Sequence, residues 1–256
     1  MPSLYVSHGG GPIPLESPEW LDPLHTWARA LPRPTAILVV SAHWESAPLS
    51  LSAVRPPELV YDFGGFDPLY YTVRYDTPDA SDLAGRVARL MPDHDRAHQH
   101  TRRGLDHGAW VPLKTMYPAA DIPVLQLSLP HDDPDKLLAL GERLRPLRDE
   151  GVLVVGSGHL THGLPFITRE MIEENKAPGW SVDFDAWAAD ALDRGDVAEL
   201  ARFRSAAPGM PYAHPTVEHF TPLFVTLGAA TDPTAPVTTK LDAYVLGLSR
   251  RSIQAT

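Results

Sequence analysis

Two histidines each come at the end of a short apolar run that is typical of a buried strand. His8 follows residues 4–6 within the segment SHGGG, and His43 follows residues 36–40 within SAHW. The carboxyl ends of parallel strands in an α/β sheet meet at one edge, and ligands bind in the crevice beyond that edge. Two neutral imidazoles placed there are suitable ligands for one metal ion. The sequence therefore predicts a metal site at this edge of the sheet.

Other histidines share this setting of strand ends and turns. His159 and His162 lie in SGHLTHGL after another apolar run, and His107 lies in GLDHGAW. Loop histidines beside glycine at the ends of a sheet are candidate ligands or acid–base groups. Because several of them follow separate strands, we expect them to converge on one site. His25 and His131 are expected at the surface.

The segment with His94, His98 and His100 requires a separate interpretation. On a helix the first two would stand one turn apart and could bind a metal, but Pro92, Asp93 and the polar residues after them disfavour a helix. We therefore expect a solvated strand or loop in this segment.

A further histidine, His219, lies in the first turn of a helix expected to begin after Thr216. The positive end of a helix dipole disfavours an imidazolium, so His219 would stay neutral, as a metal ligand must be. The alternative is that Glu218 complements the dipole and His219 caps a surface turn. The residues alone leave both interpretations open.

Apolar runs that alternate with helix-like patterns predict an α/β fold with a largely parallel central sheet flanked by helices. Its metal site would lie at the carboxyl ends of the strands. We expect one domain over residues 1–256. The expected helices are 19–31, 79–90, 134–147, 182–192, 197–203 and one from 216; the expected strands are 4–6, 36–40, 49–54, 122–129, 152–155 and an edge strand in 237–247. Turns are expected at Pro56–Pro57 and Gly64–Gly65, and a polar lid or surface excursion at 166–180.

Composition excludes several classes of site and partner. The chain has no cysteine, so any metal must be held by His, Asp or Glu. A formal net charge of −10 disfavours nucleic-acid partners, which are bound by clustered Lys and Arg. No apolar stretch approaches the roughly 18 residues of a membrane span, and residues 1–4 do not read as a secretory signal. We therefore expect no membrane partner and a cytoplasmic location.

Taken in order, the segments SHGGGP, SAHW, DFGGF, GLDHGAW, SGHLTHGL and HPTVEHFTPL resemble the class III extradiol ring-cleaving dioxygenases related to the LigB subunit. They are most similar to the single-chain 4,5-DOPA dioxygenase branch. The resemblance runs from His8 to about Leu227. It implies a non-haem Fe(II) enzyme that opens a catechol ring beside its two hydroxyls with O2, so its partners would be a small aromatic diol and O2.

The resemblance also implies roles for individual residues. His8 and His43 match the first two metal ligands of the family, and His219 falls at the third ligand position of the DOPA branch. His162 matches the histidine that acts as base and acid, and His107 matches a second histidine that positions substrate and oxygen. Three ligands on one face leave open positions at which a catecholate and O2 can bind.

Several points stay open at the level of sequence. A three-histidine site also suits Zn2+, and Glu218, His159, His162 or His214 could join the ligands or their surroundings. A zinc-dependent hydrolase or a non-catalytic binding protein on the same scaffold are the alternative functions. The catechol, the ring bond that is cleaved and self-association into a homo-oligomer are not determined. Aromatic residues near the motifs could line a planar pocket or pack in the core: Trp44, Phe63, Phe66, Trp110 and Tyr212.

Overall fold

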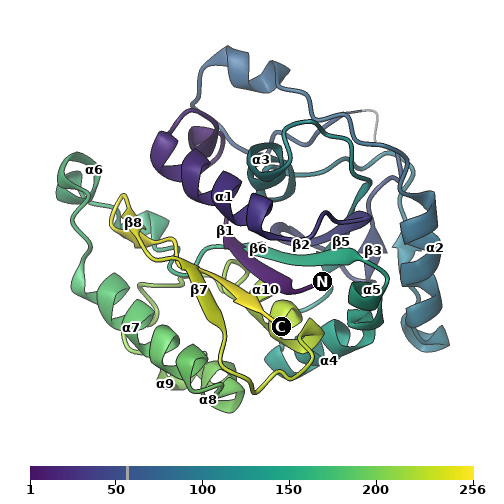
Figure 1. The fold of residues 1–256 in the computed structure, drawn as a ribbon. Helices are drawn as coiled ribbons and strands as arrows, with labels where there is room; N and C mark the ends of the chain where they lie inside the picture. Colours follow the sequence, from purple (N-terminus) through teal and green to yellow (C-terminus); the bar gives the residue numbers. More distant parts are fainter. Residues whose placement is uncertain (56–57) are drawn as a thin grey trace.

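An eight-stranded sheet crosses the centre of the computed structural model, which describes residues 1–55 and 58–256 (Figure 1). The turn expected at Pro56–Pro57 lies outside the described residues. The strand order is β4-β3-β5-β2-β6-β1-β10-β7. The strands are β1 (Ser3–Ser7), β2 (Ala36–Glu45), β3 (Ser50–Leu51), β4 (His98–Gln99), β5 (Val124–Leu129), β6 (Val152–Gly158), β7 (Thr238–Leu241) and β10 (Ser252–Ala255), while β8 (Tyr244–Val245) and β9 (Leu248–Ser249) form a separate hairpin.

The four central strands are parallel to one another. Strand β6 pairs in parallel with β1 on one side and with β2 on the other, and β2 pairs in parallel with β5. Strands β10 and β7 continue the sheet in antiparallel pairing, and β7 lies at its edge as expected from the sequence. The predicted fold class, a single-domain α/β fold with a largely parallel sheet, is confirmed.

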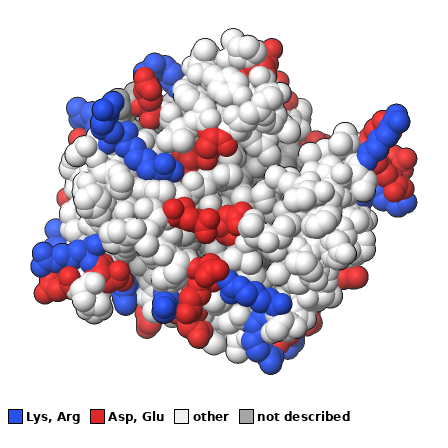
Figure 2. Space-filling view, turned by 180° about the vertical axis from the view of Figure 1, so that it is seen from behind, with Lys and Arg blue, Asp and Glu red and all other residues white. Residues whose placement is uncertain are grey.

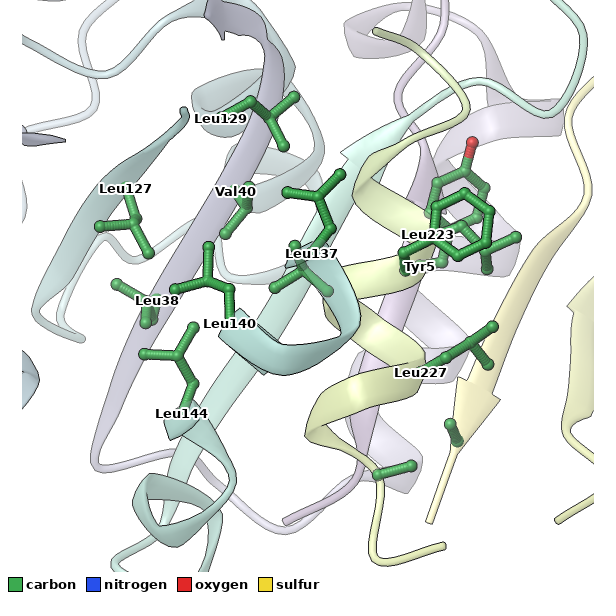
Figure 3. Close-up of a cluster of buried hydrophobic side chains, with 14 of the residues drawn as sticks. Tyr5, Leu38, Val40, Leu127, Leu129, Leu137, Leu140, Leu144, Leu223 and Leu227 are labelled. Atoms are coloured by element: carbon green, nitrogen blue, oxygen red, sulfur yellow. The ribbon is translucent and has the colours of Figure 1, made fainter. Parts of the chain in front are cut away.

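Both faces of the sheet are covered, which explains why its central strands read as continuous apolar runs. Successive side chains of a strand point to opposite faces, and β2 shows this alternation. Ile37 and Val39 join a core with α1 (Pro18–Ala30) and α3 (His107–Met116). Leu38 and Val40 join the core shown in Figure 3, beneath α4 (Pro134–Leu144) and α10 (Pro222–Ala229).

The remaining helices lie around this three-layered body of helices, sheet and helices. They are η1 (Ile13–Leu15), η2 (Pro68–Thr72), α2 (Ser81–Leu90), η3 (Asp93–Asp95), α5 (Pro146–Asp149), η4 (Leu164–Phe166), α6 (Arg169–Glu174), α7 (Gly179–Asp193), α8 (Val197–Ala201) and α9 (Phe203–Ala206). The excursion expected at 166–180 therefore contains a short helix, α6, which projects from the body (Figure 1). The segment with His94, His98 and His100 is a 3-10 turn and a two-residue strand, and it forms no metal cluster within the described residues.

The helix expected after Thr216 begins later than the sequence suggested. Helix α10 starts at Pro222, with Thr221 at its N-cap. Proline is favoured at the first position of a helix because its missing N–H would have no partner there in any case. The hydroxyl of Thr216 donates to the Glu218 carboxylate, so it does not cap the helix. His219 thus lies in the turn that leads into α10.

The charge distribution fits the acidic composition. On the face seen in Figure 2, acidic side chains form a band across the middle, and Lys and Arg lie toward the margin. This face offers no continuous basic surface of the kind that binds duplex nucleic acid. No helix within residues 1–55 and 58–256 is long and apolar enough to cross a membrane.

Helices α4 and α10 approach so closely that glycine is needed at their contact. A Cβ atom on Gly141 would lie 2.3 Å from the carbonyl oxygen of Val225, and one on Gly228 would lie 2.1 Å from that of Leu138. Real Cβ atoms do not come this close to backbone oxygens. Since α10 follows directly on the turn that carries His219, this contact also sets where that turn lies.

We expect Gly141→Ala to lower the free energy of unfolding by about 3 kcal/mol, because the added methyl group forces the two helices apart. Gly85→Ala on α2 is the matched control, since a Cβ there meets nothing closer than the Arg89 guanidinium at 3.6 Å. It should stabilise the protein by about 0.5–1 kcal/mol through helix propensity. Urea denaturation of both variants measures the difference, and equal effects would contradict the close packing.

Candidate metal centre and active site

The carboxyl ends of three adjacent strands deliver histidines to one place. His8 directly follows β1, and His159 directly follows β6, which lies between β1 and β2. His43 is the eighth residue of β2 and so lies inside the strand, not after it as the sequence suggested. The expectation that strand ends bring histidines together at one edge describes the structure well.

His8, His43 and His219 meet through their Nε2 atoms. The Nε2 atom of His43 lies 3.1 Å from that of His8 and 3.3 Å from that of His219. His8 and His219 are buried, and the side chain of His43 is 20% exposed. The structure thus brings the three residues expected as metal ligands into one cluster.

The Nδ1 atom of each of these histidines faces a partner of its own. The single hydroxyl proton of Ser157 is donated to the carbonyl oxygen of Gly108, so Ser157 Oγ accepts from His8 Nδ1 at 3.0 Å. His219 Nδ1 donates to Glu218 Oε1 at 2.9 Å, and His43 Nδ1 lies 3.4 Å from Asp62 Oδ2. A neutral imidazole that carries its proton on Nδ1 has a lone pair on Nε2. These partners therefore turn three Nε2 lone pairs toward one another.

This donor set fits a metal ion. Imidazole nitrogens bound at about 2.1 Å to one ion and spread by about a right angle are about 3 Å apart, close to the spacing seen here. Burial lowers the pKa of His43 to about 3 and holds the pKa of His8 and His219 well below the usual range. The rings are therefore neutral, as metal ligands must be. Carboxylate and hydroxyl partners on the second ring nitrogen are a common feature of such centres.

The turn that carries His219 is fixed by its backbone. The carbonyl oxygen of His219 accepts from the Tyr5 hydroxyl at 2.8 Å and from the backbone N–H of His159 at 2.9 Å. A Cβ atom at Gly158 would lie 2.0 Å from that same oxygen. Only glycine at this position lets the turn come against the end of β6. With 4% exposure, His219 is not the cap of a surface turn, so that alternative is wrong.

His107 reaches the cluster as the first residue of α3. Asp106 caps this helix by accepting from the backbone N–H of Ala109. The residue after His107 is Gly108, and a Cβ atom there would lie 3.0 Å from the His43 ring and 3.2 Å from the His8 ring. Position 108 must therefore be small for α3 to begin beside these histidines. The rings of His107 and His43 lie 3.9 Å apart between centroids.

Asp62 joins His107 to His43. Its Oδ1 atom accepts from His107 Nδ1 at 2.7 Å and from the backbone N–H of His107 at 3.0 Å, while Oδ2 faces His43 Nδ1. The hydrogen bond and the two nearby histidines outweigh burial and lower the pKa of Asp62, so the group is a carboxylate. Asp62 therefore orients two histidines that come from different segments of the chain.

His162 lies on the other side of the cluster. Its ring stacks on that of His219 with centroids 3.4 Å apart and an angle of 12° between the planes. Burial lowers the pKa of His162 to about 2, so the ring is neutral. His159 donates from Nδ1 to the carbonyl oxygen of Thr161. His214 is different, because it packs against Phe184 and Phe220 and bonds to a backbone oxygen in the core.

Other combinations of these groups are also close enough to hold an ion. The ligating atoms of His8, His43 and His107 all lie within 4.8 Å of one another. So do those of His162, Glu218 and His219. His43 belongs to the first set, and its Nε2 atom lies 3.3 Å from that of His219 in the second set. The two sets therefore form one continuous centre.

A cavity of about 370 Å3 opens over this centre. Its histidine side consists of His8, His43, His107, His159 and His162, together with Asp62. The opposite walls are apolar and comprise Ile13, Trp20, Phe63, Phe66, Leu164, Val245, Leu246 and Leu248. Apolar walls with a few convergent polar groups are typical of a small-molecule site. A larger hollow of about 590 Å3 lined by Tyr61 and Arg74 contains none of these histidines.

The aromatic residues expected around a planar ligand divide into two groups. Phe63 and Phe66 line the cavity, as predicted. Trp110 is fully buried in the core, Trp44 packs on the Arg103 guanidinium outside the cavity, and Tyr212 is 49% exposed. A pocket role for these three was wrong: Trp110 and Trp44 bury their rings in packing contacts elsewhere, and Tyr212 lies at the surface outside the cavity lining.

Comparison with known proteins identifies the family of the chain. The model of the LigB family, the catalytic LigB subunit of aromatic ring-opening dioxygenase, matches residues 1–248. The chain belongs to this family. It is 40% identical over 234 residues to the 4,5-DOPA dioxygenase extradiol of Beta vulgaris, covering 89% of this chain and 86% of that protein. The corresponding protein of Escherichia coli (strain K12) is 34% identical over 259 residues, covering 99% and 94%.

A solved structure shares the fold throughout. The crystal structure of an uncharacterized protein from Escherichia coli K12 matches with a TM-score of 0.82 at 29% identity and covers 100% of both chains. Membership of the LigB family makes this chain a metal-dependent extradiol ring-cleavage dioxygenase, and the resemblance seen in the sequence is confirmed. The comparisons favour this activity over a zinc hydrolase or a non-catalytic binding protein.

Two residues of this LigB-family site had no assigned role at the level of sequence. Asp62 lies in DFGGF, where only the phenylalanines were assigned a possible role, in lining a pocket. Ser157 lies in SGHLTHGL, where only the histidines were considered as ligands or acid–base groups. For Ser157, a polar residue between two glycines in the same motif as candidate histidines is the signal that could have indicated a role. For Asp62, the signal is a carboxylate within one of the motifs that carry the family resemblance. Their partners come from distant segments, so the sequence could not supply the pairing.

We expect Asp62→Asn to weaken metal binding by about 10–100-fold, because the amide has one acceptor oxygen where the carboxylate serves two histidines. Competition with a chromophoric chelator measures the affinity. Asp67→Asn is the matched control, since Asp67 lies five residues further on, is exposed and only caps the short helix η2. Equal affinities of the two variants would show that Asp62 does not orient the ligands.

Proposed function

We propose that residues 1–256 form one catalytic domain in which His8, His43 and His219 hold Fe(II) through their Nε2 atoms. The convergence of three Nε2 lone pairs carries this proposal. Bound Fe(II) would supply the sites at which the catechol oxygens and O2 are brought together, and it supplies the electron exchange that O2 chemistry requires. Zn2+ fits the same nitrogens but has no redox chemistry.

The substrate we propose is a catechol, a small aromatic diol, with O2 as co-substrate. The relatives from Beta vulgaris and Escherichia coli are named for 4,5-DOPA, so DOPA-like catechols are the first compounds to test. A planar ring bound in this cavity would lie between Phe63 and Phe66 on one side and the histidines on the other. The apolar walls keep water away from the reacting edge of the ring.

His162 and His107 act on protons and on orientation. His162 is a neutral ring that lines the cavity, so it can take the proton from a catechol hydroxyl and return one as the ring opens. His107, held by Asp62 on Nδ1, presents Nε2 as its remaining polar atom and positions substrate and oxygen. His159 lines the same cavity and takes no part in metal binding in this proposal.

The first test concerns the metal. Protein freed of metal and reloaded anaerobically with Fe(II) should, on admission of air, consume one O2 for each catechol and give a yellow ring-opened product. Protein loaded with Zn2+ should bind the catechol and consume no O2. His43→Ala should lose metal affinity by about 100-fold or more, whereas His25→Ala on α1 should keep it. Ring opening by the zinc-loaded protein would overturn the proposal.

The second test concerns His162. His162→Phe keeps an aromatic ring stacked on His219 but removes both ring nitrogens. We expect kcat to fall by about 100- to 10,000-fold while metal affinity stays close to that of the unaltered protein. Steady-state oxygen uptake and chelator competition give the two values. If kcat changed by only a few-fold, His162 would not be the proton acceptor.

A further inference from the structure

Two residues with left-handed backbone meet at the β8–β9 hairpin. Three non-glycine residues in the described part of the chain have a positive φ, namely Ala120, Asn175 and Leu246. Leu246, with a φ of 52°, and Gly247, with a φ of 68°, form the turn that joins β8 to β9. Such turns favour Asn, Asp or Gly at the first position, because the Cβ atom of other residues comes too close to the following carbonyl oxygen. Leu246 is therefore held in a strained conformation.

The side-chain amide of Asn175 binds this turn from behind. Its Nδ2 atom donates to the carbonyl oxygen of Tyr244 at 2.7 Å, and its Oδ1 atom accepts from the backbone N–H of Gly247 at 3.2 Å. A Cβ atom on Gly247 would lie 2.8 Å from the carbonyl oxygen of Lys176, so the turn lies directly against the end of α6. Asn175 is the only asparagine of the chain. An amide donates and accepts at once, which a carboxylate cannot do.

The hairpin depends on such contacts for its position, because it is not part of the central sheet. At its base, Asp185 of α7 accepts from the Tyr244 hydroxyl at 3.2 Å and from the Ser249 hydroxyl at 2.6 Å. Asn175 holds its tip. Between these two attachments, three apolar side chains of the hairpin line the cavity over the metal centre: Val245, Leu246 and Leu248.

The strain at Leu246 indicates that its side chain has a function. A strained backbone persists only where the surrounding structure enforces it, and such residues are concentrated at ligand sites. Of the three residues with positive φ, Leu246 lines the cavity and the other two do not. Asparagine or glycine would suit the turn better, but neither would present an apolar side chain to the cavity. The strain is therefore the cost of placing a leucine side chain in this wall.

We infer that the ring substituent of the substrate extends toward the hairpin, and that Leu246, held in place by Asn175, limits its length. This inference rests on the proposed catechol-cleaving function and names the substrate class within it, catechols with a short substituent. Phe63 lies beside the metal centre, with its ring centroid 5.7 Å from that of His107, so it faces the catechol ring itself. The hairpin wall is left to meet the substituent. Leu246 is then a specificity-determining residue, and Asn175 is a positioning residue that acts through it.

The first test uses 4-alkylcatechols whose substituents grow from methyl to hexyl. With the Fe(II)-loaded protein, kcat/KM should fall once the alkyl chain reaches Leu246. Leu246→Gly suits the left-handed backbone and removes the side chain, so kcat/KM for 4-hexylcatechol should rise by about tenfold or more relative to 4-methylcatechol. Leu246→Ala removes the same contact and serves if the glycine variant does not fold. Ala120→Gly is the matched control, because it also places glycine at a left-handed residue but lies outside the cavity lining.

The second test asks whether Asn175 acts through Leu246. Asn175→Gly keeps a residue that accepts the left-handed backbone and removes the amide, so it should relax the length preference while kcat for 4-methylcatechol stays close to that of the unaltered protein. Added to Leu246→Gly, it should relax the preference no further, because residues that act on one contact are not additive. Additive effects of the two substitutions would show that Asn175 does not act through Leu246.

A binding measurement gives the length preference without turnover. Anaerobic titration of the Zn2+-loaded protein with the same catechols can be followed by tryptophan fluorescence, since Trp20 lines the cavity. Affinity should fall at the same chain length as kcat/KM. If the unaltered protein opened every catechol of the series equally well, or if both Leu246 variants kept its length profile, the inference would be wrong and the proposed function would stand. Failure of the unaltered protein to open any catechol of the series would overturn the proposed function, and the inference with it.

Discussion

The structure depends on one arrangement, the convergence of three imidazole lone pairs at His8, His43 and His219. Their Nε2 atoms lie about 3 Å apart, which is close to the spacing of nitrogens that share one metal ion. Their orientation is fixed from behind, by Ser157, Asp62 and Glu218 on the Nδ1 atoms. A cation placed between the rings would be bound by all three lone pairs. The contacts on the Nδ1 atoms therefore preorganise the cluster for a metal.

The rest of the fold holds the backbone close enough for this arrangement. Strand β6 lies between β1 and β2, so the parallel register itself brings the segments that carry His8 and His43 to one edge. The other two segments arrive from helices, and each requires a glycine at the contact. Gly158 admits the turn that carries His219, and Gly108 admits the first turn of α3 behind His107. A side chain at either position would separate a histidine from the centre.

These relations show which features the sequence could predict. Strand ends followed by His8 and His43 are local patterns, and the parallel sheet converts them into proximity, so fold class and a histidine centre were predictable. The start of α10 was not, because the hydroxyl of Thr216 and the proline at 222 offered competing signals and the contact of α10 with α4 favours the later start. The pairing of Asp62 with His107 joins residues 45 apart, and that of Ser157 with His8 spans 149. Such pairs follow from the folded backbone and leave no periodic trace in the chain.

The cavity separates chemistry from recognition. Its histidines form one side, where we propose that the two oxygens of a diol bind, and the apolar walls are left to contact whatever the ring carries. A metal centre of neutral ligands attracts any catechol through the same two oxygens, so it cannot by itself distinguish one substituent from another. Discrimination must then come from groups that never touch the reacting atoms. Within this cavity Phe63, Phe66 and the other apolar walls are the groups in a position to distinguish one substituent from another by shape.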